Sequence, residues 1–235
     1  MCHYEECDTA SWESQLSAFQ TALQVLGGRI DFVAPIAGIG ERKWLPFPSE
    51  TQTMKEGQFA KPDLSVVDVD LTGMLYTIAL AIQQFRRQDA IEWEKGWNGR
   101  GKIGLVASVC GFYCVPSLPV YTAAKHALVG FTRSYGGLLR DEGIAVNAVS
   151  PNVVKTSIAS DLFYDILEKG GLLTPMEGLM KAFDDMLETG ESGSVYECGP
   201  KGGFSKRKGA EYLDEESEKC CELLQERAKK LHYDA

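Results

Sequence analysis

Short apolar segments of strand length alternate with helical patterns along most of the chain, and this alternation limits its fold more than any other feature. We predict strands at 30–38, 102–109, 143–151 and 193–200. We predict helices at 12–26, 64–85 and 121–141, and a further helix that passes through Phe183 and Leu187. Because buried strands that alternate with helices form right-handed βαβ units, the sequence predicts an α/β domain built on a parallel sheet.

The helices carry signals of their own. Apolar residues recur at steps of four and three from Trp12 to Leu26, and two glycines follow them. The segment 64–85 is apolar over much of its surface, which predicts a helix buried between the sheet and a partner. The stretch 174–177, "TPME", is typical of a capping box with proline at the first helical position.

Charge and cysteine content narrow the class of partner. The chain has 235 residues and a formal net charge of -9, which disfavours nucleic acids and anionic membranes because these are bound through Lys and Arg. We therefore expect a small-molecule partner. The seven cysteines include no C-x-x-C pair and the three histidines are scattered, which argues against a zinc site or a disulfide framework and for a reducing compartment. We see no leader and no apolar run of about 18 residues, and so predict a cytoplasmic protein without a membrane span.

The hexapeptide at 99–104, "GRGKIG", fits the dinucleotide fingerprint G-x-G-x-x-G. In that fingerprint a strand delivers the glycines to the start of a helix, where backbone N–H groups receive a pyrophosphate. Here the glycines precede the apolar run 102–109 and so open a strand. We interpret the stretch as a loop rich in Gly and Asn and not as a phosphate site.

Tyr121 and Lys125 lie four residues apart on a predicted helix and therefore share a face. An ammonium beside a phenol stabilises the phenolate, so the pair has the chemistry of an acid–base catalyst; the alternative is a coincidence on a helix surface. Ser108 ends the strand predicted at 102–109. Ligands of open parallel sheets bind beyond the carboxyl ends of the strands, where a hydroxyl can polarise a carbonyl. Otherwise Ser108 is a turn or capping residue.

These residues, with "YTAAK", "IAVNAVSP" followed by "NVVKT", and "DLTG" in the segment 64–85, resemble the short-chain dehydrogenase/reductase superfamily. The similarity runs from about Cys7 to Pro200. The C-terminal half, through "GLLTPMEG" and "GSVYECGP", is most similar to the prostaglandin-dehydrogenase-like branch and to related fungal secondary-metabolism reductases. The resemblance implies a Rossmann-like, three-layer α/β fold and a nicotinamide cofactor, NADP or NAD.

The resemblance also implies roles for individual residues. Tyr121 would donate or accept the proton, Lys125 would lower the pKa of Tyr121 and hold the nicotinamide ribose, and Ser108 would position the substrate oxygen. The implied cofactor contacts are Val154 and Thr156 at the nicotinamide carboxamide, Asp8 at the adenine amino group, and Ala37 and Gly38 after the strand at 30–36.

The chain departs from the family pattern in its nucleotide half. It begins just upstream of Asp8, so the family's first strand, glycine-rich phosphate loop, first helix and second strand are not in the sequence. Such a loop fixes the pyrophosphate through several backbone hydrogen bonds, and hydrogen bonds to charged groups are worth about 1.5–3 kcal/mol each. Because these bonds would be missing, we expect weak binding of NADP or NAD. Ile36 occupies the family's Asn position, and Pro35 suits either a strand that has become a sheet edge or the last turn of a strand.

Asp70, in "VDVDLTG", replaces the Asn of the family's catalytic tetrad. Near the catalytic pair, a carboxylate would favour the charged form of Lys125 but oppose a phenolate at Tyr121, so the sign of its effect on catalysis stays open. Alternatively, Asp70 faces solvent or caps a turn. We include it among the catalytic candidates.

We predict an N-terminally truncated domain at 1–200, followed at 201–235 by a basic, glycine-containing linker and a C-terminal helix that packs on the domain or on a second subunit. The first functional hypothesis is an NAD(P)-dependent oxidoreductase that acts on a secondary alcohol or ketone. The second is a protein of the same ancestry without hydride transfer, either a cofactor-free isomerase or cyclase that uses Tyr121 and Asp70, or a non-catalytic subunit. A third is a gene product that has lost its first part. Family members are commonly dimers or tetramers, so a homo-oligomer is compatible with the sequence.

Overall fold

The computed structural model describes residues 2–233, except for the side chain of Glu94. Its main sheet has five strands in the order β1-β4-β5-β6-β7. The first four are parallel to one another, as predicted, and β7 joins β6 in the antiparallel direction. These strands are β1 (Phe32–Val33), β4 (Gly101–Val106), β5 (Ile144–Pro151), β6 (Val195–Cys198) and β7 (Phe204–Lys206).

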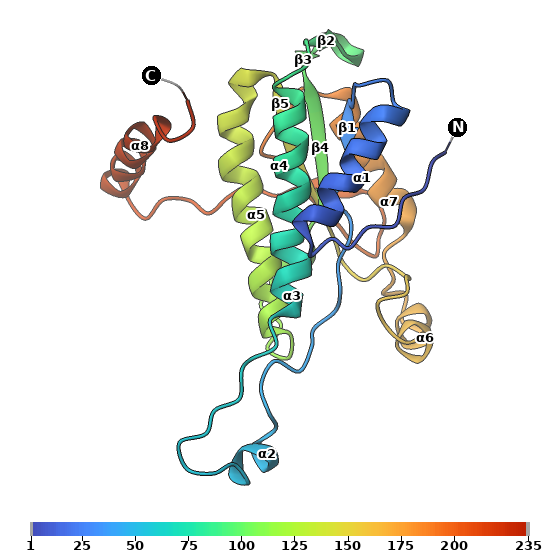
Figure 1. The fold of residues 1–235 in the computed structure, drawn as a ribbon, viewed down its shortest axis with the longest axis vertical. Coiled ribbons are helices and arrows are strands. Elements are labelled where there is room, and N and C mark those ends of the chain that lie inside the picture. Colours follow the sequence, from blue (N-terminus) through green and yellow to red (C-terminus); the bar gives the residue numbers. More distant parts are fainter. Residues whose placement is uncertain (1, 234–235) are drawn as a thin grey trace.

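Helices cover both faces of this sheet (Figure 1). α4 and α5 pack on one face, with α1 against α4, and α7 packs on the other face, which gives the three layers of a Rossmann-like α/β fold. The α-helices are α1 (Trp12–Val25), α2 (Pro48–Gln52), α3 (Ser65–Val67), α4 (Met74–Phe85), α5 (Pro119–Leu139), α6 (Asp161–Lys169), α7 (Met176–Glu188) and α8 (Glu215–Lys229). The shorter elements are the π-helical η1 (Asp68–Gly73), the 3-10 turns η2 (Glu94–Gly96), η3 (Val109–Gly111) and η4 (Arg140–Glu142), and a hairpin of β2 (Ile91–Glu92) and β3 (Asn98–Gly99).

The core lies between the central strands and the helices α4 and α5. Ile103 and Leu105 of β4 and Ile144 and Val146 of β5 are at most 1% exposed and belong to one cluster with Phe85 of α4. Strands that are covered on both faces are apolar along their whole length, which is why these segments lack the polar–apolar alternation of a half-buried strand.

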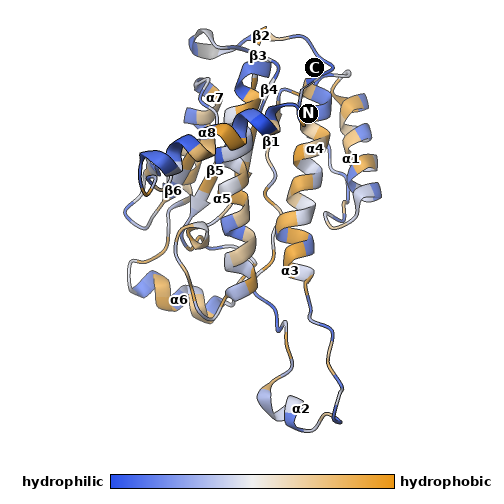
Figure 2. Ribbon diagram, turned by 90° about the vertical axis from the view of Figure 1, so that its left-hand side faces the viewer, coloured by the Kyte–Doolittle hydropathy of each residue, from blue (hydrophilic) through white to orange (hydrophobic). Residues whose placement is uncertain are grey.

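The helix predicted at 64–85 is built from α3, η1 and α4, and its second turn is π-helical. Figure 2 shows hydrophobic residues along most of α4. By length and composition alone, Ser65–Phe85 is apolar enough to cross a membrane, contrary to our reading of the sequence, and 44% of its most apolar window is buried within the protein. Ile78 and Phe85 lie in the core cluster, so packing within the protein covers part of this apolar surface.

The glycines of "GRGKIG" lie in the strands β3 and β4, where we expected a loop; Gly101 is the first residue of the buried strand β4, so the glycines open a strand as predicted. Packing explains them. A Cβ on Gly99 would lie 2.1 Å from the ring of Trp97, and a Cβ on Gly101 would lie 2.5 Å from the ring of Phe85. Gly104 also faces aromatic rings, at 2.8 Å from such a Cβ. This spacing of glycines therefore admits aromatic side chains and not a phosphate.

Two local predictions have different outcomes. β1 is an edge strand of the sheet, and Pro35 lies beyond its last paired residue, Val33, so both interpretations of this proline describe it.

The predicted capping box is wrong: α7 begins at Met176 with Pro175 as its N-cap, and within the described residues no side chain caps it. Thr174 is buried, its hydroxyl has no hydrogen-bond partner within residues 2–233, and its backbone N–H bonds to the carbonyl of Val153 instead.

The tail beyond residue 200 contains β7, which lies in the segment predicted as a linker, and α8. Figure 1 shows α8 away from the sheet and its covering helices. Within the part of the chain that the structure describes, none of the α8 residues is buried, so the helix does not pack on the domain as one alternative expected. Beyond α8 the chain returns to α5, where the hydroxyl of Tyr233 donates to the carbonyl of Leu138 at 2.6 Å.

Candidate active site

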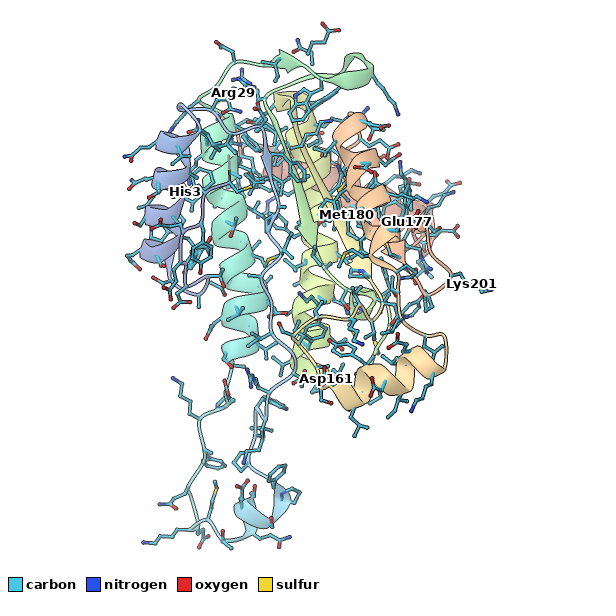
Figure 3. All side chains as sticks on the ribbon, turned by 90° about the vertical axis from the view of Figure 1, so that its right-hand side faces the viewer. His3, Arg29, Asp161, Glu177, Met180 and Lys201 are labelled. Atoms are coloured by element: carbon cyan, nitrogen blue, oxygen red, sulfur yellow. The ribbon has the colours of Figure 1, made fainter. Side chains whose placement is uncertain are left out.

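The candidate site lies at the carboxyl ends of the parallel strands, where α5 begins. The connection between β1 and α3, which carries α2, extends beyond this end of the sheet (Figure 1). α6 starts at the same end, as the position of Asp161 in Figure 3 shows. Ligands of open α/β sheets bind at this end because the connections that follow the strands leave a crevice between them.

Ser108 follows β4 and is the N-cap of η3. Its hydroxyl accepts a hydrogen bond from the backbone N–H of Cys110 at 3.1 Å, and the residue is 8% exposed. The capping interpretation of this serine is therefore correct. It is compatible with a second role, because the same hydroxyl interacts with the phenol of Tyr121.

Tyr121 and Lys125 lie one turn apart near the start of α5, on a shared face as the spacing predicts. The ammonium nitrogen of Lys125 is 5.2 Å from the centroid of the Tyr121 ring. Pro119 provides the first helical position, which it suits because it has no N–H to leave unpaired. The chain thus brings a phenol, an amine and a serine hydroxyl together at the end of the sheet.

Asp70 faces the same site and not the solvent. Its side chain is fully buried, and its Oδ2 lies 3.0 Å from Nζ of Lys125, whose side chain is 4% exposed. The Oδ1 atom accepts a hydrogen bond from the backbone N–H of Ile39 at 2.8 Å. Within the described residues Oδ2 accepts no well-directed hydrogen bond, so the contact with Lys125 is primarily an ion pair. The π-helical turn that carries Asp70 is an irregularity often found at functional sites.

The environment of Tyr121 keeps its phenol protonated at neutral pH. Burial raises the pKa of Tyr121 most, the hydrogen bond with Ser108 lowers it, and the negative charge of Asp70 raises it; together these effects place the pKa at about 12. The effect of Asp70 that the sequence left open is therefore repulsion of the phenolate. Neutralising that carboxylate would make the phenol more acidic.

Glu41 is a residue of this site that our sequence analysis missed. Its carboxylate accepts hydrogen bonds from the backbone N–H groups of Val120 and Tyr121, at 3.3 and 2.8 Å. The sequence indicated this role only indirectly. Leu118 precedes α5 and cannot cap a helix with its side chain, which indicates that a cap comes from elsewhere in the chain.

The remaining predicted residues lie around this group. Ala37 lines a cavity of about 250 Å³ with Thr9, Pro35 and Met74. Asp8 precedes Thr9 and is exposed, and its Oδ1 accepts a hydrogen bond from the N–H of Ala10 at 2.9 Å.

The segment that carries Val154 and Thr156 follows β5. Val154 is half-buried and packs against the cluster beneath α7. The hydroxyl of Thr156 lies 3.2 Å from that of the buried Tyr164 in α6, which anchors this connection. Neither residue has a described contact with Tyr121 or Lys125.

The residues present fit the nicotinamide and ribose half of the expected cofactor. Tyr121, Ser108 and Lys125 offer hydroxyl and ammonium groups at one place, and an ammonium has three N–H donors, of which the ion pair with Asp70 engages one side. Gly38 passes so close that a Cβ there would lie 3.5 Å from Nζ of Lys125. For the pyrophosphate, no described segment joins a strand directly to a helix of eight or more residues through a glycine-rich loop.

The layered sheet and the grouping of serine, tyrosine and lysine at its strand ends define the Rossmann-like class of α/β proteins. The chain belongs to the short-chain dehydrogenase family, because the family model described as short chain dehydrogenase matches residues 1–166. The resemblance noted in the sequence is thereby confirmed.

Individual relatives agree with this assignment. The chain is 30% identical over 190 residues to the short-chain dehydrogenase/reductase prx7 of Penicillium rubens, covering 80% of this chain and 64% of that protein. It is 29% identical over 186 residues to 5'-hydroxyaverantin dehydrogenase of Dothistroma septosporum, covering 77% and 55%. The structure of carveol dehydrogenase from Mycobacterium avium in complex with NAD superposes with a TM-score of 0.52 at 25% identity, covering 71% and 53%. The chain thus spans between about half and two thirds of the length of these relatives.

Proposed function

We propose that this protein is an oxidoreductase that transfers hydride between NADP or NAD and a secondary alcohol or ketone in secondary metabolism. The observation that carries the proposal is the meeting of Tyr121, Lys125 and Ser108 at the end of the sheet. Relatives named as dehydrogenases, one of them in complex with NAD, support it and do not favour the non-redox alternative.

In the proposed reduction, Tyr121 supplies the proton. At neutral pH its phenol is protonated, since its pKa is about 12, so the proton is available to the oxygen of a bound ketone. The hydroxyl of Ser108 orients that oxygen, and the ammonium of Lys125 stabilises the phenolate that remains. A bound nicotinamide would supply or accept the hydride.

Activity of the purified protein tests the proposal. We expect NADPH- or NADH-dependent reduction of ketones when the cofactor is supplied at about millimolar concentration, since the described residues lack a pyrophosphate loop. Tyr121→Phe should lower kcat by about 10²–10⁴-fold, because it removes the transferable proton, and should leave cofactor affinity nearly unchanged. Stopped-flow absorbance at the nicotinamide band and calorimetric titration provide the two measurements.

The control is Tyr113→Phe, which removes a phenol that hydrogen-bonds to Glu197 outside the catalytic pair. We expect it to retain turnover. Turnover that survives in Tyr121→Phe would remove Tyr121 from its proposed role. A wild-type protein that neither binds nor oxidises either cofactor would refute the proposed function as a whole.

The setting of the reaction is also a proposal. A small-molecule substrate, a reducing cytoplasmic compartment and a homo-oligomer stay predictions from the sequence.

A further inference from the structure

The start of α5 depends on a cap that does not come from its own sequence. The first N–H groups of any α-helix have no acceptor within the helix. Here the N-cap is Leu118, and within residues 2–233 no side chain adjacent in sequence caps α5. Pro119 has no N–H, so Val120 and Tyr121 carry the first backbone donors of the helix. One of these donors belongs to the residue whose phenol the proposed chemistry requires.

Glu41 satisfies both donors from the connection that follows β1. Its Oε1 accepts from Val120 N at 3.3 Å and its Oε2 accepts from Tyr121 N at 2.8 Å, across 80 residues of sequence in the second case. A carboxylate is favoured at this position because the helix dipole is positive at the N-terminus. Glu41 is half-buried, which limits competition from water for these bonds.

The segment that carries Glu41 also contacts the ion pair of the site. Two residues earlier, the N–H of Ile39 donates to Oδ1 of Asp70 at 2.8 Å. Asp70 in turn pairs with Lys125 at 3.0 Å. A Cβ on Gly38 would lie 3.2 Å from Oδ2 of Asp70, so this segment passes the ion pair at close range. Residues 38–41 therefore contact the backbone of Tyr121 at one end and the partner of Lys125 at the other.

We propose that Glu41 is a positioning residue that holds Tyr121 in register with the Asp70–Lys125 pair. Residues 38–41 act as a clamp between the two, so that movement of this segment changes the distance between the phenol and the ammonium. The consequence for turnover rests on the proposed function; the consequence for the geometry of Tyr121 does not. A displacement of about 1 Å in a reacting group can cost about 10²-fold in rate.

The alternative is that Glu41 caps α5 for stability alone, and Glu50 provides the matched control. Glu50 lies in the same connection and also caps a helix, accepting from the N–H of Phe47 at 2.6 Å at the start of α2. It pairs with Lys43 at 3.1 Å and has no described contact with α5. The variants Glu41→Ala and Glu50→Ala therefore remove the same group from two helix starts, only one of which carries Tyr121.

Three measurements on the full chain test the clamp: amide exchange of Val120 and Tyr121 by NMR, titration of the Tyr121 phenol by tyrosinate absorbance against a Tyr121→Phe background, and kcat with KM. The groups that act on this phenol are Ser108, Cys110 and Asp70, with Lys125 over its ring, and none of them is altered in the variants. In Glu41→Ala we expect exchange to rise at least about tenfold at both amides. We expect the phenol pKa to fall from about 12 towards the ordinary value of about 10, as the first turn opens to water.

We further expect kcat to fall about 10–100-fold in Glu41→Ala with KM within about threefold, and Glu41→Gln, which keeps an acceptor oxygen, to recover most of kcat. Glu50→Ala should leave all three readouts at wild-type values. Unchanged exchange and phenol titration in Glu41→Ala would overturn the proposal, as would raised exchange with full kcat. If Glu41→Ala does not fold, Glu41→Gln decides by the same readouts: an intermediate phenol titration supports the clamp, and a wild-type titration with wild-type exchange refutes it.

Failure of the proposed function is distinguishable from failure of the clamp. If the wild-type protein shows no turnover, the proposed oxidoreductase fails, while amide exchange and phenol titration still decide whether Glu41 positions Tyr121.

Discussion

At the scale of single residues, Asp70 determines the balance of charge around the phenol of Tyr121. Its carboxylate pairs with the ammonium of Lys125 at 3.0 Å and also raises the pKa of Tyr121. The lysine that would stabilise a phenolate is thus partly neutralised by its neighbour. The site therefore favours a phenol that keeps its proton, which suits reduction of a ketone better than oxidation of an alcohol at neutral pH.

We predict that Asp70→Asn lowers the pKa of Tyr121 below its wild-type value of about 12, because it removes the negative charge that opposes the phenolate, while burial, the largest cause of the raised pKa, remains. Alcohol oxidation, which needs the phenolate as base, should then reach its maximum at lower pH than in the wild type. The difference in tyrosinate absorbance between this variant and Asp70→Asn/Tyr121→Phe measures the pKa directly.

Asp68→Asn is the control for Asp70→Asn, because Asp68 is an exposed residue of the same π-helical turn and the change removes the same charge. We expect it to leave the titration of Tyr121 in place. A phenol pKa that rises in Asp70→Asn would show that loss of the ion pair outweighs loss of the repulsion, and would contradict our assignment of the sign.

At the scale of elements, Lys102 joins β4 to the end of α7. Lys102 is 1% exposed, and its ammonium donates to the carbonyls of Met186 at 3.2 Å and Thr189 at 2.8 Å, and also to that of Leu187. The last carbonyls of a helix have no partners within it, so a cation there satisfies them and complements the helix dipole. The rings of Trp93 and Trp97 lie 4.4 and 4.7 Å from the same ammonium.

Lys102→Met should destabilise the protein by about 2–4 kcal/mol, because methionine keeps much of the apolar stem but leaves these carbonyls without a donor. Urea unfolding should show a lower midpoint with an unchanged slope. Lys181→Met, on the exposed face of α7, removes only a surface pair with Glu177 and should change stability by less than about 0.5 kcal/mol. Equal losses of stability in the two variants would show that the hydrogen bonds from the Lys102 ammonium do not stabilise the end of α7.

At the scale of the whole molecule, the sheet and its helices form one packed body and α8 stands outside it. β7 belongs to the body although it lies beyond residue 200. Lys206 pairs with Asp185 of α7 at 2.9 Å and Arg207 pairs with Glu197 of β6 at 2.6 Å. The stability of the fold should therefore depend on β7 and not on α8.

Removing residues 210–235 should lower Tm by less than about 3 °C, because within the described residues it deletes a helix without buried residues, the hydrogen bond from Tyr233 to Leu138 and the ring contact of His232 with Tyr135. Ending the chain at Gly203, which also removes β7 and both ion pairs, should lower Tm by at least about 6 °C. Differential scanning calorimetry at a fixed protein concentration compares the two. A large loss on removing 210–235 alone would indicate that α8 packs against another copy of the chain in solution.

Periodicity predicted the elements of the body well. Buried strands and amphipathic helices are local patterns, so 102–109, 143–151 and 121–141 correspond to β4, β5 and α5 within a few residues. The capping box at 174–177 was wrong because the backbone of Thr174 bonds to Val153, a contact distant in sequence. The π-helical turn and β7 were missed because both depend on pairing and packing with other elements, for which a short stretch of sequence carries no signal.

By itself, the sequence determined the fold class, because the alternation of buried strands and helices is a local pattern, and it indicated the family through the resemblance of its motifs. Helix spacing also predicted that Tyr121 and Lys125 share a face. Only the tertiary structure decided that Asp70 is buried against Lys125 and that Glu41 caps the helix of Tyr121. It also decided that the glycines at 99–104 make room for aromatic rings. The contacts of Asp70 and Glu41 join groups that are distant in sequence, and the ring that faces Gly101 comes from another element, so these distances and this burial exist only once the layers have packed.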